Sequence, residues 1–229
     1  MKIKTIVGSL AALSALVLAT VIPAGPASAV PGGSCSIVVP QNVSIVRPYT
    51  VITGSLASDC ATSGAVFASW DLVHSYYGPS DLFIFDGVAR DTISFYDWDH
   101  LGTYTVKADR GSAWDANYNY LTQNSRAMYV KVGSRTGVSA TRLGGYVTIR
   151  VVNTYYSSAT ETFRTRGYAL ATIQSRSCST CTWVYVKTVA AAPNGVVAYR
   201  TYAPRSRYYR AVSRATSSVW GSTSASVVR

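Results

Sequence analysis

Apolar and polar residues alternate over many short stretches of the chain after residue 30. In residues 147–151, Val147, Ile149 and Val151 alternate with two polar residues, which is the period-two pattern of a half-buried β-strand. Residues 104–108 follow the same pattern. Further strands are predicted at residues 49–54, 65–72, 82–85, 127–132, 168–174, 182–188, 196–201, 208–213 and 224–228. The pattern predicts an all-β protein.

Turn-forming residues separate these predicted strands. Glycine, proline and asparagine gather at residues 77–79, 86–87, 101–102 and 193–195. Short strands at this spacing are typical of a β-sandwich or barrel. One strand is ambiguous, because Val184 and Val186 alternate with Trp183 and Tyr185, so that either set, or both, faces a core.

The first 29 residues have the pattern of a secretory signal peptide. Lys2 and Lys4 precede an apolar run over residues 6–22, and Ala27-Ser28-Ala29 provides a small-residue cleavage site. We therefore expect the mature chain to begin at Val30, to meet the membrane only during export, and to be secreted and extracellular, free or associated with a cell wall. No later stretch is long and apolar enough to cross a bilayer.

Charge divides the remaining chain into an acidic and a basic half. Residues 30–133 carry six basic residues against nine aspartates, net −3, whereas residues 134–229 carry thirteen basic residues against Glu161 alone, net +12. Each half also ends with an aromatic strand followed by a strand rich in valine. We predict one domain over residues 30–133 and a second, arginine-rich domain over residues 134–229, joined by a flexible linker near residues 134–144.

Several short motifs in the two halves have the spacing of known structural features. Leu101-Gly102-Thr103-Tyr104 is similar to a tyrosine corner, Trp70 stands where a core tryptophan packs in strand C, and Val106 replaces the second cysteine of antibody domains. In the second half, the motifs are Trp183, Asn194-Gly195, Tyr208-Tyr209-Arg210-Ala211 and the closing Ser/Val strand.

With these motifs the chain resembles bacterial secreted proteins built from tandem immunoglobulin-like, Greek-key β-sandwich domains. The resemblance implies an adhesive, spacer or wall-associated role. It assigns no chemistry, because the motifs are structural.

The four cysteines agree with export. A bridge between Cys35 and Cys60 would close a loop of about 26 residues and contribute about 3.5 kcal/mol in the chain-entropy estimate. Cys178-Ser179-Thr180-Cys181 has the spacing of a redox motif, but it lies between two predicted strands and lacks a βαβ context. We favour a disulfide that staples a hairpin. Zinc is disfavoured, since no further ligands complete a set of four.

Catalytic constellations are weak, and we expect a protein that is not an enzyme, without cofactor or metal. His74 and His100 are the only histidines, and no nucleophile elbow accompanies them. The aspartates lie mainly in turns, and no two stand out as a glycosidase pair. Asp97-Trp98-Asp99 begins like a calcium loop but lacks its later ligands, so calcium binding by the acidic half stays an open alternative.

The basic half offers one candidate binding surface. Arginine binds phosphate and carboxylate through a planar fork, and arginines here alternate with tyrosines. The candidate residues are Arg200, Arg205, Arg207, Tyr208, Arg210 and Arg214. For an exported chain the expected partner is an anionic cell-wall polymer or polysaccharide rather than nucleic acid, while a protein partner stays unidentified. The alternative is that outward arginines only solubilise the sheet and protect its edges.

Three functions follow in order of preference. The first is a non-catalytic secreted or cell-surface β-sandwich protein with an adhesive, structural or binding role. The second is a module that binds carbohydrate or an anionic cell-wall polymer. The third is a secreted enzyme or enzyme inhibitor.

Overall fold

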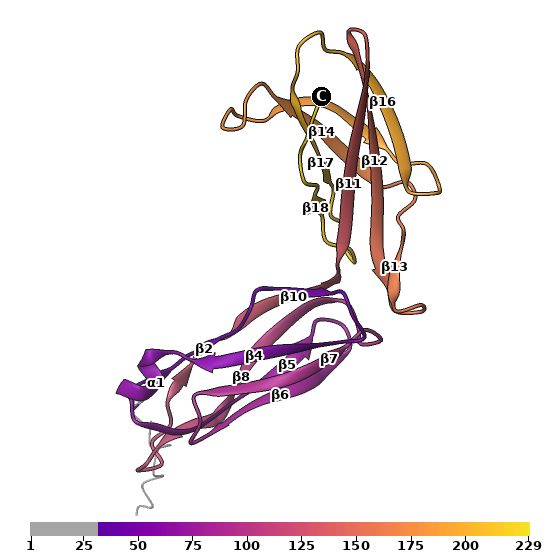
Figure 1. Cartoon of the computed structure of the whole chain (residues 1–229). Coiled ribbons are helices and arrows are strands. Elements are labelled where there is room, and N and C mark those ends of the chain that lie inside the picture. The colour runs from indigo at the N-terminus through magenta and orange to yellow at the C-terminus, as the bar shows by residue number, and fades with distance from the viewer. Residues whose placement is uncertain (1–31) are drawn as a thin grey trace, which may run out of the picture. The chain divides into compact units, whose positions relative to one another are not determined.

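The computed structural model describes residues 32–229, apart from the side chains of residues 109–111. The predicted signal peptide and the start of the mature chain lie outside the described residues. Strands dominate the described part, and its helix α1 (Ser58–Thr62) has five residues (Figure 1). None of the helices described is long and apolar enough to cross a membrane. The prediction of an all-β protein is confirmed.

Two sheets form the first sandwich. One sheet has the strand order β2-β4-β7, and the other has the order β3-β10-β8-β5-β6. A short parallel pair, β1 with β9, lies outside both sheets. The strand bounds are β1 (Ser34–Cys35), β2 (Ile37–Val38), β3 (Asn42–Ile45), β4 (Tyr49–Leu56), β5 (Ala65–His74), β6 (Gly78–Asp86), β7 (Arg90–Tyr96), β8 (Gly102–Asp115), β9 (Thr122–Gln123) and β10 (Arg126–Val132). Ile52, Trp70 and Val106 are among the side chains buried between the two sheets.

Two further sheets form the second sandwich. In the first of these sheets, β12 pairs with β11 on one edge and with β13 and β16 on the other. In the second of these sheets, β14 lies between β15 and β17, and β17 also pairs with β18 and β19. The bounds are β11 (Ser134–Leu143), β12 (Tyr146–Ser157), β13 (Thr162–Thr165), β14 (Leu170–Arg176), β15 (Val184–Ala190), β16 (Val196–Tyr202), β17 (Tyr208–Ser213), β18 (Ser222–Thr223) and β19 (Val227–Val228). Ile149, Ile173 and Tyr209 belong to its separate buried core.

Both sandwiches distribute their strands in the same way. The first sheet of each holds the strands that correspond to A, B and E of an immunoglobulin fold: β2, β4 and β7 in the first sandwich, and β11, β12 and β16 in the second. The other sheet holds the strands that correspond to C, F and G, with an added C′ strand. In the first sandwich, C, F, G and C′ are β5, β8, β10 and β6. In the second sandwich, C is β14, F is β17, G is formed by β18 and β19, and C′ is β15. Both halves of the described chain therefore show the strand arrangement of an immunoglobulin-like sandwich.

The structural motifs expected in the first half are present. The hydroxyl of Tyr104 donates to the carbonyl of His100 at 2.5 Å, which closes the tyrosine corner. Trp70 is fully buried, and its Nε1–H donates to the carbonyl of Asn124 at 2.9 Å. Val106 is also fully buried, so a methyl-bearing side chain fills the position where antibody domains carry a cysteine.

Two expectations from the sequence are wrong. Residues 134–144 are not a flexible linker, because Ser134–Leu143 is strand β11, paired with β12 along its whole length. Strand β15 is not buried on both sides, because it is an edge strand whose Val184 and Tyr185 are 60% and 61% exposed. In β11 the inward positions are mostly small or polar, and this weakens the apolar alternation that marks a strand.

Candidate functional site

The structure places two of the predicted arginines, Arg200 and Arg210, on opposite faces of the second sandwich. Arg200 on β16 pairs with Thr148 on β12, whose neighbours Val147 and Ile149 face the core. Arg200 therefore points outward from the sheet that contains β11, β12 and β16, and its Cζ lies 4.4 Å from the ring centroid of Tyr146. Arg210 belongs to β17 in the other sheet. The predicted residues thus do not form one surface.

On the outward face of the second sheet, four side chains lie together: Arg176, Trp183, Tyr208 and Arg210. The Cζ atoms of Arg176 and Arg210 each lie 4.4 Å from the centroid of the Trp183 ring. Arg176 also lies over Tyr208, with its Cζ 5.2 Å from that ring centroid. Each guanidinium over an aromatic ring contributes about 0.5–2 kcal/mol, depending on its exposure. We call these four residues the arginine–tryptophan face.

The hairpin from β14 to β15 builds this face. Ser175 pairs with Val184 in the antiparallel register, so Arg176 and Trp183 are the next opposed positions along the hairpin. Beyond them, a disulfide joins Cys178 to Cys181 and closes the loop. The expected staple is present. It limits how far the two ends of the loop separate, which holds the guanidinium over the indole.

The positive charges of this face have no acidic partner among the side chains that the structure describes. Glu161 is the only acidic residue in residues 134–229. Arg210 is instead positioned by Gln174, whose Oε1 accepts from Nε of Arg210 at 2.8 Å. The Nε atom of Arg176 is buried and has no hydrogen-bond partner among the described residues. Two guanidinium groups on one ring, without a counter-charge, repel each other and favour an incoming anion.

The other predicted arginines lie outside the arginine–tryptophan face. Arg205 and Arg207 are exposed in the connection from β16 to β17, and Arg214 is exposed just after β17. The backbone of Arg207 exchanges two hydrogen bonds with that of Arg229. The carbonyl of Arg214 accepts from the buried Arg166 at 2.9 Å, and burial lowers the pKa of that guanidinium.

In the first sandwich, the residues considered for catalysis serve the fold. His74 is buried, and its Nδ1 accepts from the backbone N–H groups of Tyr76 and Tyr77, both at 3.1 Å. The His100 ring stacks on Tyr77 with a centroid distance of 3.5 Å. Neither histidine has a nucleophile or a carboxylate as a hydrogen-bonded partner in the part of the chain described here, so no charge-relay geometry exists there.

The carboxylates of residues 97–99, considered above as a calcium loop, accept hydrogen bonds from other groups of the protein. Oδ2 of Asp97 accepts from the hydroxyl of Tyr156 at 2.7 Å, and Oδ2 of Asp99 accepts from the backbone N–H of Tyr96 at 2.7 Å. Within the described residues, no three His, Cys, Asp or Glu side chains gather in a way that could hold a metal ion. The open calcium alternative finds no support in this geometry.

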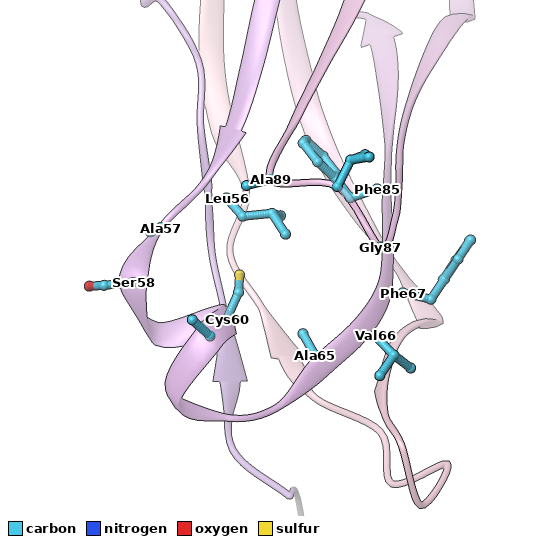
Figure 2. Close-up of a pocket in the computed structure, with 12 residues that line it drawn as sticks. Leu56, Ala57, Ser58, Cys60, Ala65, Val66, Phe67, Phe85, Gly87 and Ala89 are labelled. Carbon is cyan, nitrogen blue, oxygen red and sulfur yellow. The ribbon is translucent and has the colours of Figure 1, made fainter.

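An apolar pocket of about 350 Å³ opens at the end of the first sandwich beside α1 (Figure 2). Its lining includes Leu56, Ala65, Phe67 and Phe85. The hydroxyl of Ser58 points away from it (Figure 2). The pocket next to the Cys35–Cys60 disulfide therefore offers apolar contact but no acid, base or nucleophile.

Comparisons with known proteins do not assign a family. No protein-family model matches the chain, and no curated protein matches it. Among solved structures, the human OSCAR ligand-binding domain is 9% identical, with 86% of this chain and 98% of that chain covered and a TM-score of 0.30. The titin domains A168-A170 are 11% identical, with 85% of this chain and 65% of that chain covered and a TM-score of 0.28. The D00-D0 domain of intimin is 11% identical, with 85% of this chain and 98% of that chain covered and a TM-score of 0.26. Likeness of this degree supports no inference about function.

Sequence reasoning found only half of the arginine–tryptophan face. Tyr208 and Arg210 were predicted, but Arg176 was not, and Trp183 was assigned only a structural resemblance. A signal did exist in the sequence, because Arg176 and Trp183 each lie two residues outside Cys178 and Cys181. Two residues at equal distances outside the disulfide of a hairpin lie opposite each other on the two strands, and their side chains share one face of the sheet.

Proposed function

We propose that the chain is a secreted or cell-surface-associated, non-catalytic β-sandwich protein with a binding role, and that its second sandwich binds an anionic cell-wall polymer. The observation that carries this proposal is the arginine–tryptophan face, where Arg176 and Arg210 share the ring of Trp183 and no described acidic side chain pairs with them.

The chemistry of this face suits a phosphodiester or carboxylate polymer such as teichoic acid. Guanidinium groups bind such anions through pairs of N–H donors. Stacking on Trp183 and the hydrogen bond to Gln174 restrict the two side chains, which reduces the entropy lost when a ligand binds. The net charge of residues 134–229 attracts the polymer from a distance, and salt screens this attraction.

The disulfides support an extracellular location. Cys35 is joined to Cys60, and Cys178 to Cys181. Such bonds persist in oxidising compartments outside the cytosol. The signal-peptide pattern of residues 1–29 points to the same compartment.

Sedimentation of the purified chain with Gram-positive cell walls tests the proposal. We expect the chain to sediment with intact walls at low salt, to be released as salt rises, and to remain in solution with walls stripped of teichoic acid. Equal sedimentation with intact and stripped walls would contradict the anionic-polymer assignment. Absence of sedimentation at low salt would contradict wall binding altogether.

A further inference from the structure

A small polar pocket lies between β6 and β7 in the first sandwich. Its volume is about 260 Å³, and its lining includes Ser80, Asp81, Ser94, Tyr96 and Asp99. Both strands are at the edges of their sheets, and no further strand of the described chain pairs with their free sides. The pocket is thus reached from the side of the sandwich, and all of its residues belong to a different sandwich from the arginine–tryptophan face.

The pocket presents hydrogen-bond acceptors. In Asp81, Oδ1 accepts from the backbone N–H of Leu82 at 2.8 Å, and in Asp99, Oδ2 accepts from that of Tyr96 at 2.7 Å. The second oxygen of each carboxylate has no protein donor among the described residues. These internal bonds hold the two carboxylates in place, so their free oxygens form fixed acceptors for a ligand's hydroxyl groups.

An exposed aromatic surface adjoins the pocket through Tyr96. The Trp98 ring stacks on the Tyr96 ring with a centroid distance of 4.6 Å and an interplanar angle of 11°. Trp98 is 70% exposed although it is the largest apolar side chain of this region. Tyr49, which pairs with Tyr96 across β4 and β7, is 55% exposed. Exposed aromatics gathered at one place mark a contact surface.

We propose that this pocket and the Tyr96–Trp98 pair bind a sugar ring of a neutral oligosaccharide. A sugar supplies several hydroxyl donors to Asp81 and Asp99, and its apolar ring face packs on an aromatic side chain. A cation would also be attracted by the carboxylates and by the aromatic rings, and the test below separates that outcome from sugar binding. An anion is repelled by the carboxylates, and an apolar ligand leaves their free oxygens unpaired. This site shares no residue with the arginine–tryptophan face, and the proposal does not depend on whether that face binds an anionic polymer.

The test is calorimetric titration of the purified chain with a panel of neutral oligosaccharides, namely oligomers of glucose, of mannose and of N-acetylglucosamine. The variants are Trp98→Ala and Asp81→Asn, and Tyr76→Ala serves as a matched control, since Tyr76 is 83% exposed and outside the pocket. Trp183→Ala separates this proposal from the previous one. Glucosamine oligomers serve as the cationic probe.

We expect at least one neutral oligosaccharide to bind with little dependence on salt. Trp98→Ala and Asp81→Asn should each raise its Kd at least tenfold, while Tyr76→Ala and Trp183→Ala leave it unchanged. The proposal is overturned if no neutral oligosaccharide of the panel binds the folded chain. It is also overturned if only the cationic oligomers bind and salt abolishes that binding.

Discussion

The hydroxyl of Tyr104 donates to the carbonyl of His100, four residues earlier in the chain. Tyr209, on the corresponding strand of the second sandwich, is equally buried, but its hydroxyl has no partner among the described residues. The two sandwiches thus share a buried tyrosine on the F strand, and only the first closes a tyrosine corner with it.

This difference predicts opposite results for the same substitution. Tyr104→Phe removes a satisfied hydrogen bond and leaves the His100 carbonyl without its donor, so it should lower the free energy of unfolding by about 1–2 kcal/mol. Tyr209→Phe removes a hydroxyl that is buried without a partner, so the free energy of unfolding should stay the same or rise. Urea unfolding of the full chain measures both. An equal loss in the two variants would refute the distinction.

Alkaline pH should destabilise the fold through two buried phenols, those of Tyr104 and Tyr156. Burial raises the pKa of Tyr104 to about 12, and burial together with the hydrogen bond to Asp97 raises that of Tyr156 to about 12. An unfolded tyrosine titrates near 10. The folded state therefore holds these protons more tightly, and the stability they confer is complete below pH 10 and is lost as pH rises through 12.

Unfolding free energies measured between pH 8 and pH 12 in Tyr156→Phe and in the original chain check this. The variant should lose less stability over the upper part of the range, because one titrating phenol is gone. Parallel pH profiles for the two proteins would show that Tyr156 does not contribute.

The two disulfides should have separable effects. Replacing Cys35 and Cys60 by alanine opens the longer loop and should cost about 3.5 kcal/mol of stability, with polymer binding at the arginine–tryptophan face unchanged. Replacing Cys178 and Cys181 opens a loop with a sequence separation of 3, and the stability cost should be smaller, about 2 kcal/mol.

The second replacement should nevertheless weaken polymer binding several-fold, because the hairpin no longer holds Arg176 over Trp183. Binding of fluorescent teichoic acid to both double variants, under conditions where each is folded, provides the comparison. The staple has no role in the site if Cys178→Ala/Cys181→Ala binds as tightly as the original chain.

Local sequence patterns were sufficient to predict much of the fold. The alternation around Ile149 is sufficient to predict β12, and the spacing of Gly102 and Tyr104 is sufficient to predict the corner, since both depend on neighbours in the chain. Strand β7 was missed although Ile93 and Phe95 alternate in it with polar residues, because only two apolar positions repeat and aspartates lie close on both sides. Strand β11 was missed for the related reason that small side chains such as Ala140 face inward.

The candidate site was harder to predict, because proximity in sequence is not proximity on a sheet. Arg200 and Arg210 are close in the chain, but they lie on strands of different sheets and point in opposite directions. Arg176 and Arg210 are far apart in the chain, yet β14 and β17 are neighbours, with Gln174 paired to Arg210. Only the strand order reveals which arginines share a face.

The central claim is that a defined face, rather than net charge, binds the anionic polymer. Its most direct test compares Arg176→Gln/Arg210→Gln with Arg200→Gln/Arg150→Gln in teichoic acid binding across a salt series. Both variants lose two positive charges, but the second pair belongs to β12 and β16 on the opposite sheet. We predict that the first variant raises Kd at least tenfold, about 1.4 kcal/mol, and that the second raises it less than threefold. Equal losses in both variants would show that binding follows net charge alone and would contradict the proposed site.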